Sequence, residues 1–139
     1  MSTLYTMFSS LAPGLRAMEA GTTLRSTSPP YMDLVGEVLE RSADGRVQRV
    51  SLAHYYEQNG DLMADPEMEF RVVHPSTSGP GMLVPLHYKQ DGLGIFRPTH
   101  GPGVVYPKQL KEQVKFTRFW LRNLKSQGHR LNRGTVPNS

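Results

Sequence analysis

Residues 46–73 contain the pattern that decides the fold, RVQRVSLAHYYEQNGDLMADPEMEFRVV. Apolar and polar side chains alternate on either side of the pair Asn59-Gly60. Such alternation is typical of a strand buried on one face, and an Asn-Gly pair suits the positive φ angles of a type I′ turn. The stretch therefore predicts a β-hairpin, with a new strand beginning at Asp65-Pro66. One face of the first strand is expected to carry Val50, Leu52, His54 and Tyr56.

Two further turn signals, Asp44-Gly45 and Asp91-Gly92, flank this hairpin. Three such pairs between alternating runs predict an antiparallel β-meander of about five strands, the first over residues 31–41 and the last over 93–97. Residues 21–30 are small and polar and end in two prolines, so we expect a connecting loop there.

The fourth run of the meander contains a conflict. Its alternation predicts one apolar face made of Met82, Val84, Leu86 and Tyr88. Pro85 lies inside the run and has no N–H for the strand ladder, which indicates an edge strand or a bulge.

Helical periodicity marks both ends of the chain. Near the N-terminus, apolar residues at positions 4, 7, 8 and 11 recur at helical spacing before Pro13-Gly14. Near the C-terminus, Pro107 stands where a helix would begin and Gly128 where it would end. Its apolar face is expected to comprise Leu110, Val114, Phe116, Thr117, Trp120, Leu121 and Leu124. These elements predict a single α+β domain over residues 1–129, with both helices packed on the meander, and a flexible basic tail over 130–139.

The composition excludes several classes of protein. The 139 residues include no cysteine, which rules out disulfides, thiol nucleophiles and metal sites built on thiolates. No apolar run reaches the roughly 18–20 residues that span a bilayer, and residues 1–12 lack the features of a secretory signal. No nucleophile elbow or phosphate-binding loop is present. We therefore expect a cytoplasmic protein with no membrane contact, no cofactor and no assignable catalytic residue.

The net charge of +4 conceals a strong asymmetry. Residues 1–96 carry 7 Lys and Arg against 11 Asp and Glu, whereas residues 97–139 carry 9 Lys and Arg against Glu112 alone. Most of the positive charge falls on one stripe of the C-terminal helix, where His129, Arg130 and Arg133 would extend it. A cationic stripe is typical of contact with nucleic acid or with an acidic protein surface, although a solvated helix face would look the same. The candidate binding residues are Lys108, Lys111, Lys115, Arg118, Arg122 and Lys125.

The central hairpin holds the densest group of polar side chains. Carboxylates and a histidine of this kind could bind a hard metal ion, but their spacing matches no EF-hand, and turn chemistry explains Asn59 and Asp61 equally well. Glu67 and Glu69 are two apart on a strand, loosely as in restriction-type nucleases. Arg71 stands where those enzymes need a lysine, and an arginine is a poor activator of water. We expect both glutamates to face solvent.

Three segments together resemble a bacterial domain-of-unknown-function family that is carried on plasmids, integrative elements and prophages. They are SLAHYYEQNGDLMADPEMEFRV, PLHYKQDGLGIF and FWLRNLKSQGH, and the resemblance covers residues 31–129. The resemblance implies no activity, but it implies an accessory role in a mobile element, such as DNA maintenance, transfer or interference with host defence. It also implies a family signature of unknown role, formed by His54, Glu57, Gln58, Asn59, Asp61, Asp65 and Glu67.

Three functions from different classes follow from these features. The leading hypothesis is a non-enzymatic binding protein whose basic helix contacts nucleic acid or an acidic protein, for example a component of host defence. The second is a metal-dependent hydrolase or nuclease centred on His54, Glu57, Asp61 and Asp65. The third is a structural module that self-associates through the exposed strand near Pro85.

Overall fold

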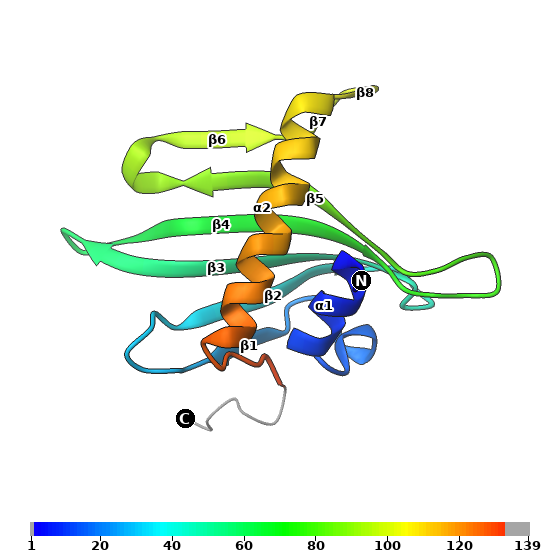
Figure 1. Cartoon of the computed structure of the whole chain (residues 1–139), viewed down its shortest axis with the longest axis horizontal. Coiled ribbons are helices and arrows are strands. Elements are labelled where there is room, and N and C mark those ends of the chain that lie inside the picture. The colour runs from blue at the N-terminus through cyan, green and yellow to red at the C-terminus, as the bar shows by residue number, and fades with distance from the viewer. Residues whose placement is uncertain (1, 133–139) are drawn as a thin grey trace.

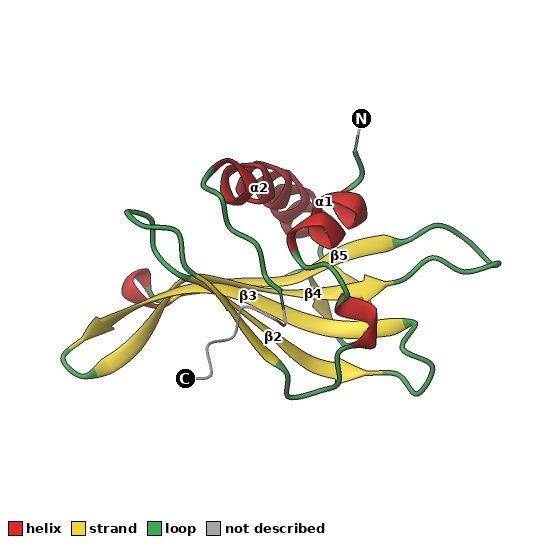
Figure 2. Ribbon diagram, turned by 90° about the horizontal axis from the view of Figure 1, so that it is seen from below, coloured by secondary structure: helices red, strands yellow, loops and turns green. Residues whose placement is uncertain are grey.

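The computed structural model describes residues 2–132 as a six-stranded antiparallel sheet with two α-helices on one of its faces (Figure 1, Figure 2). The strands lie side by side in chain order, so the predicted α+β meander is confirmed. No helix in residues 2–132 is both long and apolar enough to cross a membrane. The elements are α1 (Leu4–Leu11), the 3₁₀ turn η1 (Leu15–Ala17), β1 (Thr23–Ser26), β2 (Leu34–Arg41), β3 (Val47–Gln58), β4 (Asp61–Val73), β5 (Met82–Gln90), the 3₁₀ turn η2 (Asp91–Leu93), β6 (Ile95–Pro98), the two-residue strands β7 (His100–Gly101) and β8 (Val104–Val105), and α2 (Pro107–Ser126).

The sheet has one strand more than the sequence indicates. β1 lies within residues 21–30, where a loop is predicted, and pairs with β2 from Thr23↔Glu37 to Ser26↔Leu34. Leu24 is the one apolar side chain of β1 and is buried in the core. A single apolar residue among polar ones produces no alternation that a pattern could detect, so the loop prediction was wrong here.

The central hairpin forms as predicted at its turn but not at its second strand. Asn59 and Gly60 have φ angles of 54° and 84°, as a type I′ turn requires. β4 begins directly after the turn and not at Asp65-Pro66. Asp65 and Pro66 of β4 lie opposite the single residue His54 of β3, because Ala53 pairs with Glu67 and Tyr55 with Ala64. Two residues opposite one form a β-bulge. Pro66 has no N–H to donate, and the bulge lets β4 continue past it.

β5 contains the predicted bulge, which changes the face of the strand. Phe70 pairs with Pro85 and Glu69 with His87, so Leu86 is the extra residue. Thr99 bonds to the bulge, its Oγ1 donating to the Pro85 carbonyl at 2.8 Å. The prediction that Met82, Val84, Leu86 and Tyr88 share one face was wrong. The side chains opposite the buried residues of β4 are those of Leu83, Pro85 and Tyr88.

The core lies between the sheet and the two helices. α2 contributes most of the predicted apolar face, with Thr117, Trp120, Leu121 and Leu124 buried. The packed part of the chain also continues past residue 129, because Leu131 is 1% exposed and its N–H donates to the Leu11 carbonyl at 2.7 Å. Residues 133–139 of the expected tail lie outside the described residues.

A buried chain of hydrogen bonds fastens the N-terminal segment to the sheet. The Gln48 amide nitrogen donates to the carbonyls of Leu15 at 2.8 Å and Met18 at 3.0 Å, so its oxygen is the acceptor for His74 Nε2 at 2.6 Å. His74 therefore carries its proton on Nε2, and Nδ1 accepts from the Tyr5 hydroxyl at 2.7 Å. Burial, with the positive charges of Arg16 and Arg41, lowers the pKa of His74 below its ordinary value.

Gln48→Leu tests this chain, because it removes the acceptor of the His74 Nε2–H and the donor to the Met18 carbonyl, while the Leu15 carbonyl keeps its bond from the Met18 N–H at 2.9 Å. We expect the free energy of unfolding to fall by about 2–4 kcal/mol in urea denaturation. The same change at the exposed residue Gln58 is the matched control and is expected to shift stability by no more than about 0.5 kcal/mol. Equal effects of the two substitutions would contradict the anchoring role of Gln48.

The lowered pKa of His74 makes stability depend on pH. Below the ordinary histidine pKa of about 6.5, the unfolded chain takes up a proton that the folded chain does not. Stability is therefore complete above about pH 6.5 and falls as the pH drops below that value. We expect His74→Gln to lose less stability than the wild type between about pH 7 and pH 5. His100→Gln, at an exposed ring, serves as the control and should keep the wild-type pH dependence.

Candidate nucleic-acid interface

α2 positions the candidate binding residues because both of its ends are defined. Pro107 occupies the first helical turn, and Gly128 adopts a φ of 88° just past the last. The Gly128 N–H donates to the Lys125 carbonyl and the His129 N–H to the Leu124 carbonyl, each at 3.0 Å, which is the Schellman arrangement. The 20 residues between them give a rod about 30 Å long.

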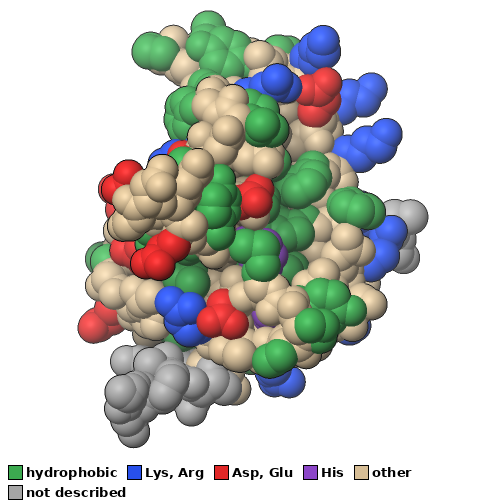
Figure 3. Space-filling view, turned by 90° about the vertical axis from the view of Figure 1, so that its left-hand side faces the viewer, with side chains coloured by type: hydrophobic (Ala, Val, Ile, Leu, Met, Phe, Trp, Pro, Cys, Tyr) green, Lys and Arg blue, Asp and Glu red, His purple; other side chains and the backbone are tan. Residues whose placement is uncertain are grey.

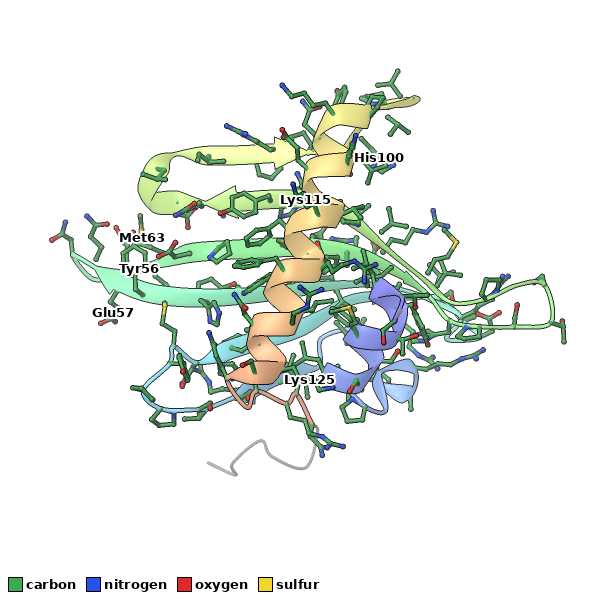
Figure 4. The ribbon with its side chains drawn as sticks, viewed as in Figure 1. Tyr56, Glu57, Met63, His100, Lys115 and Lys125 are labelled. Carbon is green, nitrogen blue, oxygen red and sulfur yellow. The ribbon has the colours of Figure 1, made fainter. Side chains whose placement is uncertain are left out.

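The six predicted cations lie on the side of α2 that faces away from the sheet, and we call them the basic stripe. Figure 4 labels two of them, Lys115 and Lys125, at different heights along the helix. Arg118 is half-buried and donates to the Ser2 carbonyl at 2.8 Å, whereas the other members are exposed. The basic stripe consists of Lys108, Lys111, Lys115, Arg118, Arg122 and Lys125.

His129 does not extend the basic stripe, which corrects the expectation from spacing. Its side chain is 5% exposed, and its Nδ1 lies 2.9 Å from the Ser26 hydroxyl. Burial, with the neighbouring His54, lowers the pKa of His129. The turn at Gly128 causes the difference, because it directs the chain away from the helical path one residue before His129. Arg130 is exposed, and Arg133 lies outside the described residues.

The negative charges of the sheet do not neutralise the basic stripe. Within residues 2–132 the ion pairs join side chains of the sheet and its loops, and none includes a residue of α2. Glu67 and Glu69 alternate with the buried Met68 and Phe70, so they point to the sheet face opposite α2. Figure 3 shows the resulting separation, with Lys and Arg along the right edge and Asp and Glu mainly towards the left.

A groove of about 490 Å³ lies beside the basic stripe, between α1 and α2. Thr6 and Ser10, one turn apart on α1, add hydroxyl groups to its wall. No carboxylate is among the described side chains that line it. Hydroxyl and guanidinium groups are the donors that proteins most often direct at phosphate oxygens. The cations of the groove are Arg118, Arg122, Lys125 and Arg130.

The structure does not bring the signature residues together. His54 is buried, with Nδ1 2.9 Å from the Asp33 carbonyl and its ring 5.7 Å from that of Trp120. Figure 4 shows Glu57 near the tip of the β3–β4 hairpin, away from α2. The other exposed members at this tip are Gln58, Asn59 and Asp61.

The last two signature residues have partners within the sheet. Asp65 accepts from the Gln90 amide at 2.9 Å. Glu67 accepts from His87 at 3.3 Å, and this hydrogen bond lowers the pKa of Glu67. Glu67 and Glu69 lie on the sheet face opposite the buried Met68 and Phe70, as expected, and there they are half-buried and paired. No group of three or more metal-binding side chains is found within residues 2–132, so the metal hypothesis gains no geometric support.

Two contributors to the candidate interface are not among the residues expected from the sequence. The hydroxyl groups of α1 reach the groove only because α1 and α2 are neighbours in space, which no local pattern shows. Phe119 is 57% exposed on α2, between Lys115 and Arg122 along the helix. The helical spacing alone places Phe119 outside the buried face of α2. Its ring lies 6.4 Å from that of Phe116.

Residues 6–130 match a family described as a domain of unknown function (DUF6908). The chain belongs to this family. The match includes α1 from Thr6 onwards and all of α2, and so extends beyond the resemblance over residues 31–129. Neither the curated proteins nor the solved structures contain a match to the chain. The description of the family names no activity for its members.

Turn chemistry accounts for Asn59, and a substitution series tests this. Asn59→Ala places a Cβ-bearing residue without a polar side chain at positive φ, so we expect a loss of about 1 kcal/mol in the free energy of unfolding. Asn59→Gly should be close to neutral, since glycine adopts this conformation freely. The control is Glu57→Ala at the same tip, expected within about 0.5 kcal/mol of the wild type by thermal or urea denaturation. If Asn59→Ala left the free energy of unfolding unchanged, Asn59 would have a role other than forming the turn.

Proposed function

We propose that this protein is a non-enzymatic nucleic-acid-binding protein that contacts phosphates through the basic stripe and the adjoining groove. The observation that carries the proposal is the absence, within residues 2–132, of any ion pair between the stripe and a carboxylate. Exposed cations on a structural helix commonly have acidic neighbours three or four residues away. Glu112, the sole acidic residue of α2, has this spacing only to Lys108 and Lys115, and among the described residues it forms an ion pair with neither. Unpaired cations of one sign along a rod are suited to a polyphosphate chain.

An acidic protein surface would meet the same charges, but the composition of the stripe favours nucleic acid. Four of its six members are lysines, and lysine is depleted in the buried centre of protein–protein interfaces. The groove adds hydroxyl donors next to guanidinium groups, a combination common in contacts to phosphate oxygens. An acidic protein partner is therefore the alternative outcome of the test.

The resemblance to proteins of mobile elements supports a setting for this binding. We propose that the protein acts as an accessory factor of such an element, in DNA maintenance, in transfer or against a host-defence component. The proposed contact to phosphates is compatible with each of these roles because it requires no particular base sequence.

Charge reversal on the stripe tests the proposal. In fluorescence anisotropy with labelled 12-nucleotide DNA at low salt, we expect Lys115→Glu plus Arg122→Glu to weaken binding about tenfold or more. The slope of log affinity against log salt should also become shallower, by roughly 0.7–0.9 for each phosphate that the variant no longer neutralises.

Arg16→Glu plus Arg71→Glu is the matched control, since both arginines are exposed, lie outside α2 and give the same change of net charge. This variant should bind nearly as the wild type does. An equal reduction of affinity in the two variants would show a net-charge effect and contradict a site on α2. Wild-type protein that binds no DNA or RNA at low salt would overturn the proposal and favour a protein partner.

A further inference from the structure

One flank of the basic stripe carries an exposed aromatic ring. Phe119 is 57% exposed, and helical geometry places it next to Lys115, four residues before it, and Arg122, three residues after it. A group that lies flat on the Phe119 ring is therefore within reach of a cation on either side. The opposite flank of the stripe borders α1 and the groove.

Phe119 is the outermost member of a row of rings, which we call the aromatic shelf and define as Tyr88, Phe116 and Phe119. The Phe116 ring lies 6.4 Å from that of Phe119 and 5.4 Å from that of Tyr88. The buried Trp120 supports the row from below, with its ring 5.8 Å from Phe116. The Tyr88 hydroxyl donates to the Gln90 side chain at 2.9 Å. Tyr88 and Phe116 are thus held by contacts within the fold, and Phe119 extends the shelf into solvent.

Apolar surface lies between the two charged regions of the molecule. Figure 3 shows apolar side chains gathered between the Lys and Arg along the right edge and the Asp and Glu towards the left. A bound polyanion placed on this side of the molecule is drawn to the stripe and repelled from the acidic side. Its non-phosphate parts then lie over the shelf.

This arrangement separates single-stranded from double-stranded nucleic acid. The base faces of a duplex are covered by stacking on one another, so a duplex offers no flat apolar group to Phe119. A single strand exposes its base faces, and aromatic side chains beside a cationic track are the usual means of binding it. α1 also lies alongside α2 on the same face of the sheet, so α2 does not stand free as a groove-reading helix would (Figure 2).

We propose that the protein binds single-stranded nucleic acid, with phosphates along the basic stripe and at least one base stacked on Phe119 at the edge of the aromatic shelf. The inference rests on the proposed nucleic-acid binding and adds the class of ligand. Because stacking tolerates every base, little sequence preference is expected.

Three labelled probes of equal length test the inference by anisotropy, namely single-stranded dT12, a 12-residue abasic strand with the same phosphates, and a 12-base-pair duplex. We expect the wild type to bind dT12 about tenfold or more tightly than the abasic strand, and more tightly than the duplex. Phe119→Ala should remove most of the preference for dT12 over the abasic strand and leave the salt slope unchanged. Phe119→Trp should retain the preference, because any aromatic ring can stack.

Leu93→Ala is the control, since Leu93 is another exposed apolar side chain and lies in η2, outside α2 and the shelf. Its preference for dT12 should match the wild type. Equal binding of dT12 and the abasic strand, or tighter binding of the duplex, would overturn the single-strand inference while the proposed phosphate contact stands. Failure of all three probes and of a 12-nucleotide RNA to bind would overturn both. Circular dichroism of each variant confirms that the exposed substitutions leave the fold intact.

Discussion

The Gln48 side chain is the fixed point on which the arrangement of the two helices depends. Its amide donates both N–H groups to carbonyls at η1, and its oxygen accepts from His74, so the segment after α1 is tied to β3 and to the end of β4. An amide buried in this way is costly unless every donor and acceptor is satisfied, which specifies one placement of the segment. The C-terminal end of α1 is also held by the bond from the Leu131 N–H to the Leu11 carbonyl. These bonds therefore fix the position of α1 relative to α2, and this position creates the groove between the two helices.

The features that could be predicted from sequence are those with a local cause. The turn at Asn59-Gly60 follows from two residues that tolerate positive φ, and α2 follows from its spacing, its proline and its glycine. The features that were missed depend on partners distant in the chain. β1 is a strand because β2 offers it an edge, and the apolar face of β5 is set by a bulge that bonds to Thr99. Helical spacing placed the exposed cations correctly, but it included His129, whose position depends on the chain reversal at Gly128.

The one-sided architecture explains how a modest net charge becomes a strongly polar surface. Both helices cover the same face, so the polar side chains of the central strands remain on the other. There the carboxylates find cations of their own, with Arg49 bridging Glu40 at 3.1 Å and Glu69 at 2.8 Å. These pairs occupy basic residues of the sheet and leave its surface acidic. The cations of α2 are separated from them by the thickness of the core, so the two charge sets act on different sides of the molecule.

The signature and the basic stripe are linked through one residue. His54 belongs to the β3 segment of the signature, yet its ring lies 5.7 Å from Trp120 and 6.0 Å from His129, at the C-terminal part of α2. Its Nδ1 is 2.9 Å from the Asp33 carbonyl, which ties the chain just before β2 to the same point. His54 thus supports the part of α2 that carries Arg122 and Lys125. Two further members shape the hairpin that bears His54, Asn59 through the tight turn and Asp65 through the bulge at Asp65-Pro66. In this way a residue of the expected signature helps to position the helix that carries the basic stripe.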